Sequence, residues 1–165
     1  MKKLVYLFLI AATLFACNQN EKSSNTDQSN NTPATTSPVP AASAEQYPAM
    51  PLDTLRMLYD RTDYIDFVFY TEEFSISQNE KPSIQSSFTH ISSEQAVLNP
   101  GCKPIGRIFY QIEGVNRFEA EFFLSQDCIY YLFYQNGKKM YTSKMTQQGF
   151  NFFANIYKQI GKPIQ

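Results

Sequence analysis

The chain has 165 residues and a formal net charge of −1, which is the length of one ordinary domain with additional segments. Its 14 basic and 15 acidic side chains nearly balance, so it lacks the concentrated positive charge of nucleic-acid-binding proteins and of polybasic membrane-surface binders. Apolar residues make up 43% of the sequence, which is enough to build a hydrophobic core.

The first residues have the pattern of a secretory signal peptide. Lys2 and Lys3 supply a positive start, and residues 4–14 form an uncharged apolar run. This run is shorter than the roughly 20 residues that a helix needs to cross a bilayer, so we interpret it as the core of a signal peptide. It ends in Leu14-Phe15-Ala16-Cys17.

This ending resembles the lipobox of bacterial lipoproteins, with a leucine, a small residue and the cysteine in the expected places. The resemblance implies removal of residues 1–16, a diacylglyceryl thioether on Cys17 and further acylation, for example with palmitate. Such acyl chains hold a protein on the membrane almost permanently. Asn18 stands where enterobacterial lipoproteins retained in the inner membrane carry aspartate, so the resemblance favours the outer membrane. The alternative is an ordinary cleaved signal peptide followed by an unmodified cysteine.

Residues 17–45 are expected to be the lipidated cysteine and a disordered tether. After Cys17 the segment contains no aromatic residue, leucine, isoleucine or methionine, so it cannot bury enough apolar surface to offset the entropy of ordering. The aromatic residues gather in the remaining part, residues 46–165, which we interpret as one globular domain. This combination of an Asn/Ser-rich tether and aromatic-rich strands resembles uncharacterised lipoproteins of the Bacteroidota.

The first half of the domain contains one clear helix and one clear strand. Leucines and Tyr59 spaced by three and four residues after Pro51 predict a helix ending near Arg61. Residues 64–70 are aromatic and β-branched and predict a strand. Residues 75–100 are ambiguous between helix, strand and loop; the spacing of Ile84, Phe88 and Ile91 favours a short helix.

The segment 107–123 predicts a β-hairpin whose two faces differ. A three-residue loop at 114–116 would place Tyr110 opposite Ala120. One face of the hairpin is then wholly apolar. A shift of the pairing by one residue would turn every side chain of one strand to the opposite face and mix polar with apolar side chains, so the clean separation favours the three-residue loop. The opposite face carries mixed side chains, namely Arg107, Phe109, Gln111, Arg117, Glu119, Glu121 and Phe123.

The last part of the chain predicts two strands and a helix. Cys128–Tyr134 is apolar on both faces, which is typical of a central strand, and Asn136-Gly137 predicts a tight turn into a strand near residues 139–142. Thr146 is a candidate cap for a helix that bears Phe153, Ile156 and Ile160 and ends at Gly161. The predicted fold class is therefore α+β: an antiparallel meander of four to five strands with N- and C-terminal helices packed on it.

Cys102 and Cys128 remain once Cys17 is lipidated. An even pair outside the cytoplasm predicts a disulfide, and both residues precede strands that run in the same direction, so they lie at the same end of the sheet. A redox pair is the alternative, although the chain has no CxxC motif.

The mixed face of the hairpin is the candidate contact surface, formed by Arg107, Phe109, Glu119, Glu121 and Phe123. Exposed aromatic rings among charges are typical of binding surfaces. Two alternatives stay open, a solvated ladder of charges and a face covered by a helix. Glu119 and Glu121 share this face and could also serve as an acid–base pair or bind a cation.

No catalytic or metal-binding motif stands out, so no cofactor and no metal are expected. Gly-rich phosphate loops, GxSxG, HExxH and EF-hand patterns do not occur, and His90, the one histidine, is expected at the surface. The favoured function is a non-enzymatic envelope module that binds a protein partner or supports an assembly. The alternatives are a carrier for an apolar ligand and an envelope hydrolase using Glu119 or Glu121.

Overall fold

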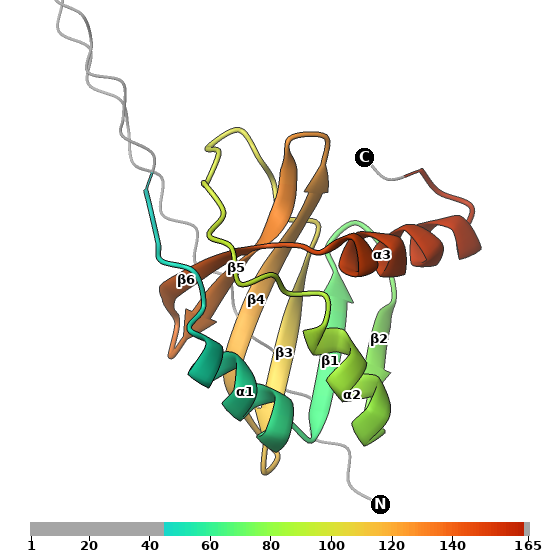
Figure 1. The fold of residues 1–165 in the computed structure, drawn as a ribbon. Helices are drawn as coiled ribbons and strands as arrows, with labels where there is room; N and C mark the ends of the chain where they lie inside the picture. Colours follow the sequence, from blue (N-terminus) through green and yellow to red (C-terminus); the bar gives the residue numbers. More distant parts are fainter. Residues whose placement is uncertain (1–44, 164–165) are drawn as a thin grey trace, which may run out of the picture. The chain divides into compact units, whose positions relative to one another are not determined.

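The computed structural model describes residues 45–163, and the predicted signal peptide, Cys17 and most of the predicted tether lie outside them. The described part contains three helices and six strands (Figure 1). Among these helices, none is long and apolar enough to cross a membrane. The elements are α1 (Leu52–Arg61), β1 (Tyr64–Phe69), β2 (Ser75–Gln78), α2 (Lys81–Phe88), β3 (Gly106–Ile112), β4 (Val115–Ser125), β5 (Cys128–Gln135), β6 (Lys138–Lys144) and α3 (Gln147–Gln159).

The strands form one antiparallel sheet in the order β2-β1-β3-β4-β5-β6. The predicted α+β class is confirmed, and the sheet has one strand more than the upper expected number. The additional strand is β2, an edge strand in the ambiguous segment, with Ile76 as its one apolar residue. Strands β3 to β6 form the predicted meander, in which each strand pairs with the next one in the chain. After β2, however, the chain passes through α2, and β3 then pairs with β1 instead of β2.

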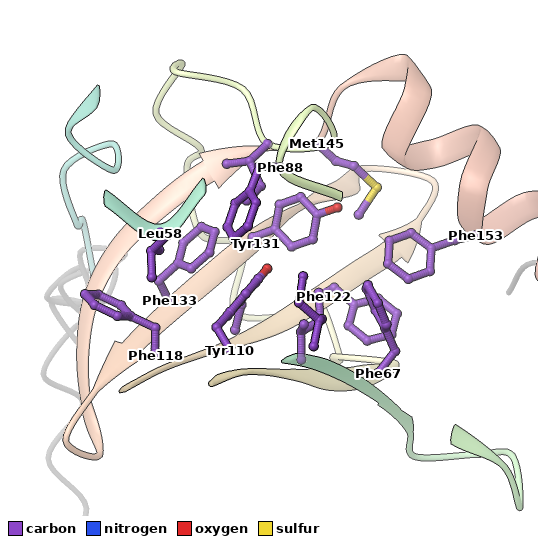
Figure 2. Close-up of a cluster of buried hydrophobic side chains, with 14 of the residues drawn as sticks. Leu58, Phe67, Phe88, Tyr110, Phe118, Phe122, Tyr131, Phe133, Met145 and Phe153 are labelled. Atoms are coloured by element: carbon purple, nitrogen blue, oxygen red, sulfur yellow. The ribbon is translucent and has the colours of Figure 1, made fainter. Parts of the chain in front are cut away.

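All three helices pack on the same face of the sheet, which we call the helix face (Figure 1). Leu58 of α1, Phe88 of α2 and Phe153 of α3 meet the inward side chains of the strands in one core (Figure 2). The ring of Phe153 stacks on that of Phe122 with centroids 4.5 Å apart. The predicted packing of the N- and C-terminal helices on the sheet is therefore observed, with α2 as a third helix on the same side.

The predicted helix ends at Pro51 and Thr146 are both observed. Pro51 is the N-cap of α1, and the Thr146 hydroxyl accepts a hydrogen bond from the Gly149 amide at 3.2 Å, which satisfies one free donor of α3. Gly149 also lets α3 approach the segment after α2 closely, because an added Cβ would lie only 2.8 Å from Cβ of His90. Ile160 is the exception to the predicted apolar stripe, since it is 38% exposed.

The β3–β4 hairpin has the predicted faces but a different register. Tyr110 lies opposite Phe118 instead of Ala120. The turn is the two-residue Glu113-Gly114, both with positive φ (55° and 71°), as the tight turns that match strand twist require. A bulge then leaves Arg117 unpaired. The observed pairing of β3 with β4 is therefore shifted by two residues from the predicted one. Because side chains alternate along a strand, a shift of two residues leaves the same side chains facing the core.

The β5–β6 hairpin agrees with the sequence prediction. Asn136 and Gly137 both have positive φ, at 52° and 73°, and β5 lies between β4 and β6. The free edge of β6 is met by two other segments: the amide of Thr142 donates to the Pro48 carbonyl and that of Lys144 to the Glu94 carbonyl, both at 2.9 Å. Backbone groups at this edge are thus partly paired within the chain.

Candidate functional site: the open face and the loop pocket

The face of the sheet opposite the helices is exposed over β1, β3 and β4. Side chains alternate along these strands, so every second residue points away from the core. None of the three described helices packs on this side, so the alternative of a helix cover is not observed within residues 45–163. We call this surface the open face; its partly exposed residues are Tyr64, Asp66, Val68, Arg107, Phe109, Gln111, Glu119 and Glu121.

An ion-pair network lies at the centre of the open face. Arg107 donates through Nη1 to Glu119 Oε2 and through Nη2 to Glu121 Oε1, each at 2.9 Å. The strand register explains the geometry, since Arg107 lies directly opposite Glu121. The Tyr134 hydroxyl donates to the other oxygen of Glu121 at 2.7 Å, and the guanidinium carbon of Arg107 lies 4.9 Å from the centre of the Tyr134 ring.

The network is more ordered than the predicted solvated ladder of charges. The side chains of Arg107, Glu119 and Glu121 are 29%, 29% and 16% exposed. Burial disfavours the charged guanidinium, but the hydrogen bond and charge of Glu121 outweigh it and raise the pKa of Arg107 above its ordinary value. Burial and the hydrogen bond to Glu121 raise the pKa of Tyr134. The guanidinium of Arg107 therefore stays charged and the hydroxyl of Tyr134 stays protonated at neutral pH.

Phe109 and Phe123, predicted on one surface, have different environments. Phe109 lies between Asp66 of β1 and Glu119 of β4 and is partly exposed. Phe123 is only 5% exposed, and its ring stacks on Tyr130 at 4.4 Å. Its predicted exposure is wrong because the chain between α2 and β3 covers this end of the sheet.

That covering segment is residues 92–105, which we call the covering loop. Ala96 of the loop packs with Phe123, Cys128, Tyr130 and Leu132 in a second, smaller core. The predicted disulfide between Cys102 and Cys128 is present, with the two Cα atoms 6.0 Å apart. It fixes the loop to the first residue of β5. The β5 residues were recognisable in the sequence as apolar on both faces, but their loop partners gave no periodic signal.

A pocket of about 450 Å³ lies between the covering loop and the sheet. Its sheet side is formed by Phe123, Tyr130, Leu132 and Tyr134. The loop side consists of Leu98, Asn99, Pro100, Cys102 and Pro104, and the charged residues are Glu45, Glu121 and Lys139. We call it the loop pocket. Of the predicted site residues, Cys102, Glu121 and Phe123 thus share one cavity, while Arg107 joins it through Glu121.

His90 is buried, at 7% exposure, instead of lying at the surface. Its ring packs on Phe152 with centroids 4.9 Å apart, and burial lowers its pKa. The residue lies just after the C-cap of α2 and packs against Gly149 and Phe152 of α3. Within residues 45–163 no group of three or more His, Cys, Asp or Glu residues could hold a metal ion.

The comparisons with known proteins give no family for this chain. No protein-family model, no curated protein and no solved structure matches it. The candidate site therefore rests on its own geometry: a helix-free sheet face with a fixed Arg107 network, adjoining a pocket under a disulfide-held loop.

Proposed function

We propose that the protein is a lipid-tethered, non-enzymatic module of the bacterial envelope that binds a protein partner through the open face. The observation that supports this most is the one-sided sheet: the helices cover one face, and Phe109 with the Arg107 network remains accessible on the other. Protein interfaces are enriched in aromatic residues and arginine.

The open face is already organised for contact with another protein. The Arg107 guanidinium is held by two carboxylates and lies over the Tyr134 ring, so little side-chain entropy is lost when a partner binds. The same contacts argue against catalysis by Glu119 or Glu121, because both carboxylates already bind Arg107. The hydrolase alternative therefore gains no support from this geometry.

The proposed anchor explains why such a domain would carry a long polar tether. An acylated Cys17 would keep the domain at the membrane, for which we propose the outer membrane. The 28 residues 18–45 would span on the order of 30 Å as a flexible chain. A partner in the envelope would thus be within reach, and nucleic acid is not proposed as a ligand.

Site-specific photo-crosslinking in intact cells tests the binding face. A photoreactive amino acid at Phe109 should give one adduct of discrete mass, which excess untagged protein suppresses. The matched control is the same group at Lys158, an exposed residue of α3 on the helix side, where no such adduct is expected. Equal adducts from both positions, or none from Phe109, would contradict the proposal.

Metabolic labelling with a fatty-acid probe tests the anchor separately. The wild-type protein should take up the label and fractionate with membranes, whereas Cys17→Ala should do neither. An unlabelled wild-type protein would refute lipidation and leave the ordinary signal peptide as the explanation for residues 1–16.

A carrier for a small ligand is the second candidate function, because the loop pocket is large enough for one. Binding pockets commonly have volumes of roughly 300–1,000 Å³, and the loop pocket has about 450 Å³ with aromatic side chains on its sheet side. Glu45, Glu121 and Lys139 among its lining residues do not suit a wholly apolar ligand. A bound molecule released from protein purified out of native membranes would favour this function over the first.

A further inference from the structure

The loop pocket combines aromatic side chains with an excess of negative charge. Phe123, Tyr130 and Tyr134 supply the rings. Its three charged residues are Glu45, Glu121 and Lys139, with a sum of −1. The neighbouring Arg107 and Glu119 cancel each other and leave this sum unchanged. Aromatic faces and carboxylates both attract cations, the first through the negative face of the ring.

The protein already holds one cation beside this pocket by the same contacts. Arg107 lies over the Tyr134 ring at 4.9 Å and donates to Glu121 at 2.9 Å. Both Tyr134 and Glu121 also line the pocket. A second cation entering the pocket would meet side chains of the same types, namely aromatic rings and a carboxylate, with Glu45 as the carboxylate that Arg107 does not bind.

The chain's own Lys139 lies at the charged part of the pocket. Its Nζ is 2.7 Å from Glu45 Oε2 and 5.9 Å from the centre of the Tyr47 ring. The hydrogen bond and charge of Lys139 lower the pKa of Glu45. Because the Lys139 side chain is 40% exposed, it can move aside, and Glu45 then becomes available to an incoming cation.

We propose that the loop pocket binds an arginine or lysine side chain of the protein partner. This inference rests on the proposed function and specifies the chemistry of the partner: a basic residue that projects from the surface contacting the open face. The cationic head would approach Glu45 and Glu121, and its alkyl stem would lie along the aromatic side chains of β5. Arginine and lysine commonly bury their stems in this way.

Nuclear magnetic resonance titration of the mature lipidated chain in non-ionic detergent tests this with a simple probe. Arginine blocked at both ends should produce saturable shifts of amides around Tyr130, Leu132 and residues 98–104. Blocked citrulline has nearly the same shape without the charge, and it should bind at least about fivefold more weakly, the size expected for one cation–π contact with an ion pair. Blocked glutamate should cause no saturable shift.

Three surface variants assign the effect to the pocket. Lys139→Gln removes the side chain that competes for Glu45 and should raise the affinity for blocked arginine about two- to fivefold. Glu45→Gln should lower this affinity by a similar factor. Lys144→Gln is the matched control, because Lys144 forms an equivalent exposed pair with Glu94, which does not line the pocket. It should leave binding unchanged.

Two results would overturn the inference: equal affinity for blocked citrulline, or no saturable shift with blocked arginine. Neither result affects crosslinking at Phe109. A discrete adduct there with no response to blocked arginine would therefore support the proposed protein-binding function and refute only the proposal that the partner inserts a basic side chain. Conversely, arginine binding without a Phe109 adduct would refute the proposed protein contact and identify the pocket as a site for a free cationic ligand.

Discussion

The two faces of the sheet are buried by different means. On the helix face, α1, α2 and α3 place residues such as Leu58, Phe88 and Phe153 into a continuous core. On the other face, β4 and β5 are covered only by the covering loop, which carries Ala96 and Leu98 and is crosslinked through Cys102. The remainder of that face, over β1, β3 and the part of β4 that carries Glu119 and Glu121, stays open.

The difference indicates which parts of the molecule are built for stability and which for contact. Three helices bury large aromatic side chains, and this burial supplies most of the favourable free energy of folding. The covering loop has no helix or strand of its own, so it depends on the crosslink, a few apolar contacts and a few hydrogen bonds to β6 and β4. Segments with few buried contacts open most readily, and the loop pocket lies under such a segment.

The helix face should show the largest loss of stability on mutation. Phe153 is fully buried and stacks on Phe122, so Phe153→Ala should lower the free energy of unfolding by about 3–5 kcal/mol through lost burial and an unfilled cavity. Urea unfolding of the purified protein measures this. Ile160→Ala at the exposed end of α3 is the control and should change stability by less than about 0.5 kcal/mol.

The disulfide should contribute somewhat less to stability than Phe153. Its removal should loosen only the sheet face opposite the helices, where the covering loop lies. Closing a loop between residues 26 apart in sequence contributes about 3–4 kcal/mol in the chain-entropy description. Reduction should therefore lower the melting temperature. Cys102→Ala, Cys128→Ala and the double variant should lose similar amounts, because each removes the same crosslink.

Limited proteolysis shows whether that loss is local. Within the globular domain, reduced protein should be cut first in residues 92–105, while α3 and the hairpins stay intact. Cleavage that starts in α3 would mean that the crosslink supports the helix face as well, and the contrast between the two faces would not hold. Two free thiols in protein taken from the envelope would contradict the disulfide itself.

The helix face could be predicted from the sequence because its burial repeats with a regular period. Leu58 follows a helical spacing, and the alternation along β3 and β4 predicted the apolar face of that hairpin correctly even though the pairing was shifted by two. An error of two residues leaves the faces unchanged. The turn itself was missed because Glu113, which adopts positive φ, is not a residue type that predicts such a turn.

The other face could be predicted only in part, because a loop has no period. The even number of cysteines indicated the disulfide, and the alternation placed Arg107, Glu119 and Glu121 together. Apart from Cys102, nothing in residues 92–105 indicated that they fold back over Phe123, so its burial and the pocket were not foreseen. The strand β2 was missed for a similar reason, since a short edge strand needs little apolar surface.

The smallest expected effect concerns His90, where the chain leaves α2 to begin the covering loop. Burial lowers the pKa of His90, so below the unfolded-state value of about 6.5 the unfolded chain takes up a proton that the folded protein does not. The free energy of unfolding should then fall as the pH decreases below about 6.5 and should not depend on His90 above about 7.5. Urea unfolding over this range tests the sign, and His90→Gln should remove the slope, because the carboxylates titrate only nearer pH 4. An unchanged slope in His90→Gln would show that His90 is protonated equally well in the folded protein, and that the junction of α2 and α3 is as open to water as the far face.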